Sequence, residues 1–180
     1  MSAMPQRSIV DRMKGAAMLD VHTYEEVEAD RGATGQAFVV VVIVAICAAI
    51  GGIGRDGAGI LVGPLMAILG WLLWAGVTMI VGTRLFGGTA DWGELLRTLG
   101  FAQSPGVFAL LAIIPFLGVL ALFVVGIWQL VAGVIAIRQA LDFSTGKAIM
   151  TAIVAWLVVM IVSAIVGGLF GLGNFVTGLV

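Results

Sequence analysis

The chain has 180 residues, 61% hydrophobic and 11% charged, against roughly 45–50% and about 25% in soluble domains, which excludes an ordinary soluble domain. The formal net charge is −1, so the chain has no overall basic field and no nucleic-acid partner is expected. Cys47 is the only cysteine, which excludes an intrachain disulfide and a thiolate metal site.

The first 35 residues are the polar part of the chain and are predicted to form a separate cytoplasmic segment, residues 1–35. Between Ile9 and Leu19 the apolar residues share one helical face, and Arg12 lies off that face. This amphipathic pattern predicts a helix that lies flat on the membrane surface or packs on the protein's own cytoplasmic face. A second short helix is expected to begin at Thr23, which fits a capping box with Glu26.

Residues 36–180 are predicted to form a membrane domain, because runs of about 18 or more apolar residues indicate membrane helices. Residues 106–140 contain a single charge, but one helix of that length would measure about 52 Å, too long for a hydrocarbon core of about 30 Å. Pro115 to Gly118 supply a break. The fold class is therefore an all-α integral membrane protein, a five-span helical bundle preceded by N-terminal amphipathic helices. The predicted spans are 36–54, 60–82, 105–117, 119–138 and 148–171.

A short polar helix is expected between the second and third spans. Asp91 and Glu94 fit a helix start, and Gly100 fits a left-handed stop. Trp92 and several leucines share one side, which favours a helix lying in the membrane interface.

The charges indicate an orientation. With five spans and the N-terminus inside, eight Lys and Arg residues fall inside and only Arg55 outside, as the bias of Lys and Arg toward cytoplasmic loops requires. The expected location is the inner (cytoplasmic) membrane, with the N-terminus inside and the C-terminus outside.

No catalytic, cofactor-binding or metal site is predicted. His22 lies near Glu25 and Glu26 in sequence, but three potential ligands within five residues are a weak metal signal. Asp91 and Glu94 are acids at a helix start, where acids are favourable for structural reasons. No predicted span has an ionisable residue near its middle, which argues against a charge-coupled transporter.

Polar and small residues within the spans are candidates for helix packing. Gln129 is expected to bond to a neighbouring helix. Small residues recur at intervals of four, and the pattern leaves open whether they pack within this chain or against another chain. The candidates are Gly59, Gly63, Ser163, Gly167 and Gly171.

Three stretches resemble the Yip family (Ypt/Rab-interacting membrane proteins), in its bacterial-type form. They are "RMKGAAMLDVHTYEEVEADRGATG", "FGGTADWGELLRTLGFAQSPGVF" and "IWQLVAGVIAIRQALDFSTGKAIMTAIV". The resemblance implies a membrane protein without catalytic residues. Eukaryotic members act in membrane traffic and bind small GTPases and one another, but their long acidic N-terminal domain has no counterpart here.

The predicted function is a non-enzymatic membrane scaffold that binds other membrane proteins or itself, in contact with membrane lipids. The alternative is a transporter or channel-like subunit for small uncharged solutes. Trp92, Arg97 and Phe101 are the candidate partner contacts, since Trp and Arg are common at binding hot spots. In the competing interpretation, the short helix only closes the inner end of the bundle.

Overall fold

The structure is a computed structural model that describes residues 7–52, 59–114 and 116–177, without the side chains of residues 59–62, 163 and 166–177. The described residues form helices joined by short turns and include no strand. In chain order the helices are α1 (Ile9–Ala17), α2 (Val21–Ala29), α3 (Ala33–Gly51), α4 (Gly59–Phe86), α5 (Trp92–Ala102), the 3-10 helix η1 (Ser104–Ile113), α6 (Leu117–Ala140) and α7 (Thr145–Thr177).

Five elements of the described chain are long and apolar enough to cross a membrane: 33–51, 63–86, 92–113, 117–140 and 145–162. This confirms the all-α membrane fold with five spans. Four predicted spans overlap α3, α4, α6 and α7. The predicted hairpin at Arg55 and Asp56 lies outside the described residues.

The third span differs from the prediction, because it begins inside the short polar helix. The capping box at Asp91 is present, but Gly100 does not end the helix. Gly100 packs against Ala37 of α3, where a Cβ on Gly100 would lie 2.8 Å from the Cβ of Ala37. The chain passes from α5 into η1 at Gln103, next to Pro105, and the two helices form one element over 92–113. The expectation that the leucines of α5 face the membrane interface is wrong, because Leu95, Leu96 and Leu99 are buried within the protein.

α5 occupies the centre of the molecule. It contacts α2, α3, α4 and α6, and the α5–η1 element is the most buried of the five spans. A break then separates η1 from α6, as predicted. Phe116 at this break has a φ of 67°, a left-handed conformation that interrupts a helix.

The N-terminal helices pack on the membrane helices. α1 contacts α2, α5 and η1, and α2 contacts α5 and α6, which favours the second of the two interpretations of the amphipathic pattern. Ser8 caps α1 and Asp20 caps α2. The prediction that Thr23 caps the second helix is wrong, because Thr23 is buried inside α2 and its hydroxyl donates to Asp20 at 2.7 Å.

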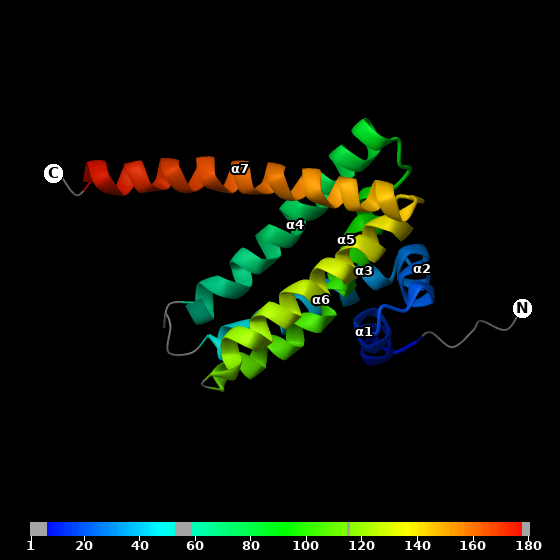
Figure 1. Cartoon of the computed structure of the whole chain (residues 1–180), viewed down its shortest axis with the longest axis horizontal. Coiled ribbons are helices and arrows are strands. Elements are labelled where there is room, and N and C mark those ends of the chain that lie inside the picture. Colours follow the sequence, from blue (N-terminus) through cyan, green and yellow to red (C-terminus); the bar gives the residue numbers. More distant parts are fainter. Residues whose placement is uncertain (1–6, 53–58, 115, 178–180) are drawn as a thin grey trace, which may run out of the picture.

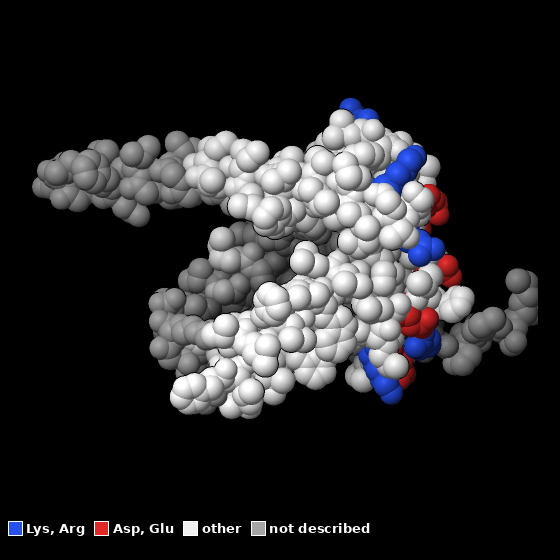
Figure 2. Space-filling model, viewed as in Figure 1, with Lys and Arg blue, Asp and Glu red and all other residues white. Residues whose placement is uncertain are grey.

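Charged residues gather at one end of the molecule, the end at which α1 and α2 lie (Figure 2). Successive membrane helices run in opposite directions, which brings their basic residues to the same end. The C-terminal ends of α4 and α6 carry Arg84 and Arg138, and Lys147 lies in the first turn of α7. Arg97 lies in the middle of α5, against the C-terminal end of α2. The remaining described basic residues lie in or next to α1, α2 and α3. We refer to this end as the charged face.

α7 is the least buried of the five spans over residues 145–162. Over its C-terminal half it extends away from the other helices (Figure 1). Its fully buried residues, Ala148, Thr151 and Ala155, are small, which lets α7 approach its neighbours α4 and α6 closely.

Candidate functional site

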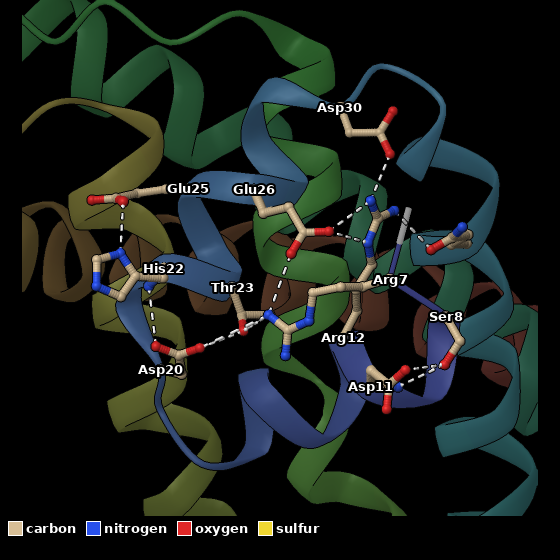
Figure 3. A network of polar contacts seen from close by, with 11 residues as sticks. Arg7, Ser8, Asp11, Arg12, Asp20, His22, Thr23, Glu25, Glu26 and Asp30 are labelled. Atoms are coloured by element: carbon tan, nitrogen blue, oxygen red, sulfur yellow. Dashed lines mark hydrogen bonds and ion pairs between the residues drawn. The ribbon is translucent and has the colours of Figure 1, made fainter. Parts of the chain in front are cut away.

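A network of ion pairs stabilises the N-terminal helices (Figure 3). Arg12 is 1% exposed, and its Nη2 lies 2.9 Å from Glu26 and 2.8 Å from Asp30. Its Nη1 donates to Gln36 of α3 at 3.0 Å. Arg7 also reaches Glu26, at 3.3 Å. One guanidinium therefore joins α1, the C-terminal part of α2 and the first span, and it holds the pKa of Asp30 below its usual value through the hydrogen bond.

Two side chains of the membrane helices satisfy the free carbonyls at the ends of α1 and α2. Trp128 of α6 donates its Nε1–H to the carbonyl of Ala17 at 2.7 Å. Arg97 of α5 donates its Nε–H to the carbonyls of Val27 and Glu28, both at 3.0 Å. The last carbonyls of a helix have no partner within the helix, so these bonds dock the N-terminal helices on the membrane domain.

The structure separates the three candidate partner contacts. Trp92 is 41% exposed at the charged face, whereas Arg97 is 5% exposed and Phe101 is fully buried. Arg97 is not free to contact a partner, because α2 covers α5 and two carbonyls of α2 accept from the guanidinium. Of the three, only Trp92 is placed where a partner can reach it directly.

Glu28 is the most perturbed carboxyl group on the charged face. Its pKa is raised to about 7, chiefly by burial and next by the nearby charges of Asp142 and Glu94, which together outweigh the opposite effect of Arg97. The side chain is therefore poised to take up or release a proton near neutral pH.

The other candidate polar residues have structural roles. His22 lies 3.3 Å from Glu25 on the exposed side of α2. The Asp91 and Glu94 side chains each accept the backbone N–H of the other residue at 2.7 Å, the reciprocal bonds of a capping box. Within the described residues no group of three or more His, Cys, Asp or Glu side chains is arranged to hold a metal ion.

A cavity of about 600 Å³ lies between α4, α6 and α7, with α5 at its base. Its walls are apolar except for Gln103 and Gln129, and no ionisable side chain lines it. Trp74 of α4 and Trp156 of α7 form part of the walls. Figure 2 shows the molecule hollowed beside α7. A cavity of this size is typical of small-molecule sites.

The two glutamines form a polar contact in the middle of the membrane domain. Gln129 Nε2 donates to Gln103 Oε1 at 2.9 Å and to the Gln103 carbonyl at 3.3 Å. This is the bond to a neighbouring helix that the sequence suggested for Gln129. The same two side chains also line a second cavity of about 440 Å³ between α3, α4, η1 and α6, so the pair lies in the wall between both cavities.

Comparison with known proteins identifies the family. Residues 20–167 match the family model of the Yip1 domain. The chain belongs to the Yip1 family. No curated protein and no solved structure matches the chain.

The Yip1 match begins at Asp20, the N-cap of α2, and includes part or all of each of the five spans. α1 precedes the matched residues. Arg12, which ties α1 to α2 and α3, therefore comes from outside the matched Yip1 domain, as does Ala17, which accepts from Trp128.

Of the small residues predicted to pack, only Gly63 has surroundings that the structure describes. At Gly63 no atom lies within 4 Å of a Cβ built on the backbone, so this glycine does not mark a close approach within the chain. The packing surroundings of Gly59, Ser163, Gly167 and Gly171 lie outside what the structure describes. Close approaches occur instead at Gly51 and Gly106, which the sequence pattern did not indicate and where a Cβ would meet Ala109 and Val44.

Proposed function

We propose that this Yip1-family chain is a non-enzymatic membrane adaptor that binds a transmembrane helix of another membrane protein through α7. The observation that carries the proposal is the exposure of α7, which leaves the bundle over its C-terminal half (Figure 1) and is the least buried of the spans. Its 33 residues correspond to about 50 Å, longer than the hydrocarbon core.

The spacing of small residues on α7 supports a helix as the partner. Thr151 and Ala155 are buried within the chain, and after an interruption at Val159 the same interval of four resumes at Ser163, Gly167 and Gly171. Small residues at this spacing let two membrane helices approach closely. The buried part of this ridge is used within the chain, so we assign the continuation to a partner helix.

Photo-crosslinking from the native membrane tests this proposal. A photoreactive residue at Ser163 is expected to give an adduct with a discrete protein, whereas one at Ile161, about 200° away on the helix, is not. Gly167→Ile should reduce the Ser163 adduct about tenfold, and the matched control Gly168→Ile should leave it nearly unchanged. An adduct of twice the chain mass would identify a second copy as the partner. Adducts with lipid alone, or equal adducts at both positions, would refute the proposal.

We further infer that the charged face lies in the cytoplasm, because it carries eight of the nine Lys and Arg residues. Trp92 is the exposed aromatic residue on this face and stays our candidate contact for a peripheral partner. An inner-membrane location of the multi-pass chain is part of the same proposal.

The alternative, a subunit that conducts small uncharged solutes, has weaker support. Such a role calls for a continuous polar path, and the two cavities are lined by apolar side chains apart from Gln103 and Gln129. Solute-driven swelling of vesicles that contain the purified chain would support this alternative over the adaptor.

A further inference from the structure

The cavity between α4, α6 and α7 has a lining that restricts the charge of any occupant. It lies within the membrane-spanning helices, and all of its lining residues are uncharged. A charged headgroup without a counterion in an apolar environment costs many kcal/mol. An occupant of this cavity is therefore uncharged.

The glutamine pair specifies a polar group on the occupant. Gln129 uses its Nε2 on Gln103, and within the described chain the Gln103 Nε2 donors and the Gln129 Oε1 acceptor have no hydrogen-bond partner. An amide carries two donors and an acceptor oxygen with two lone pairs. A hydroxyl group both donates and accepts, so one hydroxyl can bond to the free groups of both glutamines.

The room for an apolar chain comes from two glycines. Gly126 and Gly133 of α6 line the cavity, and no atom lies within 4 Å of a Cβ built at either position. Their spacing of seven places both on one side of α6. These glycines therefore widen the cavity instead of bringing α6 and α7 together.

We propose that this cavity binds an uncharged membrane lipid with a free hydroxyl group, such as a diacylglycerol. Its hydroxyl bonds to Gln103 and Gln129, and an apolar chain lies along Gly126 and Gly133 between α6 and α7. The cavity opens beside α7 (Figure 2), which gives a lipid a lateral entry. This binding does not depend on the adaptor function proposed above.

Photolabelling of the purified full chain in phosphatidylcholine vesicles tests the proposal. The probe is a photoreactive diacylglycerol, and the comparison probe is phosphatidic acid with the same photoreactive chain, which differs by its charged headgroup. We expect the diacylglycerol to label cavity-lining segments of α4, α6 and α7 about tenfold more strongly than the phosphatidic acid. Excess unlabelled diacylglycerol should suppress this labelling in the unmodified chain.

Variants locate the site. Gly133→Leu fills the cavity and should reduce labelling about tenfold, while Gly63→Leu, an equal change outside both cavities, should not. Gln129→Leu removes the hydrogen bond of Gln129 to the lipid hydroxyl, together with its bonds to Gln103. It should reduce labelling roughly threefold to tenfold, the equivalent of about 0.6–1.4 kcal/mol. Equal labelling by both probes, or a failure of unlabelled diacylglycerol to compete in the unmodified chain, would overturn the proposal even if a variant failed to fold.

Discussion

Two buried arginines, Arg12 and Arg97, hold the N-terminal helices against the membrane helices. They use different kinds of hydrogen-bond acceptor. Arg12 meets two carboxylates, whereas Arg97 meets the carbonyls at the C-terminal end of α2. A helix C-terminus carries a partial negative charge, so Arg97 receives both hydrogen bonds and favourable electrostatics there. Arg97, a predicted partner contact, is instead a fixed contact between α5 and α2.

Replacement of Arg97 should therefore destabilise the protein. Arg97→Met leaves the buried carbonyls of Val27 and Glu28 without their donor, and we expect a loss of about 2–4 kcal/mol. Arg138→Met removes an exposed guanidinium and should change stability by at most about 0.5 kcal/mol. Thermal unfolding in the same detergent measures both variants. A similar small effect for the two would contradict the docking role of Arg97.

The carboxyl of Glu28 predicts a pH dependence of stability. Its pKa is about 7 in the folded chain, above its usual value of 4.5, so the folded state binds more protons between these pH values and loses stability as pH rises through them. Glu28→Gln should therefore stabilise the protein above pH 7, by about 1 kcal/mol once screening by solvent is included.

The two proteins should have the same stability at pH 4, where Glu28 is protonated in both the folded and the unfolded chain. Unfolding midpoints across this pH range give the comparison. A constant gap at every pH would show that the effect of Glu28→Gln is not linked to titration.

At the scale of single elements, close contacts of glycine determine how α3 meets the third span. Gly100 packs against Ala37 of α3, whose Cβ lies 2.8 Å from a Cβ built at Gly100. Gly100→Ala should force α3 and α5 apart and destabilise the protein by about 1–3 kcal/mol. Gly35→Ala is the control, because nothing lies within 4 Å of a Cβ there and alanine favours a helix. If both variants are equally stable, the helices are not in close contact at Gly100.

The third span shows where the sequence pattern stops being informative. Four spans follow from apolar runs and helix length alone. The start of the third contains Glu94 and Arg97, which indicates a surface helix when only local composition is considered. Their compensation comes from the capping box and from carbonyls 69 and 70 residues away in the chain, and such a distant contact leaves no trace in local periodicity.

The candidate site was predicted only in part, for a related reason. Gln129 was identified as the polar group inside a span, but its partner Gln103 was not. Gly126 and Gly133 fit a packing face by spacing. Whether such a face meets a helix or leaves a cavity depends on the path of α7, which the spacing on α6 does not determine.

At the scale of the whole molecule, the charged face predicts the orientation in the membrane. The third span begins earlier than expected, but the number of crossings stays five, so the N-terminal helices, the turn before α5 and the turn between α6 and α7 all remain on one side. Because that side holds eight of the nine basic residues, it should be cytoplasmic.

Single cysteines in a Cys47→Ala background test this orientation. A cysteine at Asp56 or Leu179 should react with a membrane-impermeant maleimide in intact cells, and one at Thr89 should react only after the membrane is opened. Thr89 is exposed and suits the cysteine substitution. The neighbouring Gly88 does not, because a Cβ there would lie 2.6 Å from the Leu141 side chain. Reaction at Thr89 in intact cells, with protection at Asp56, would show that the charged face lies outside and that the distribution of Lys and Arg does not set the orientation of this chain.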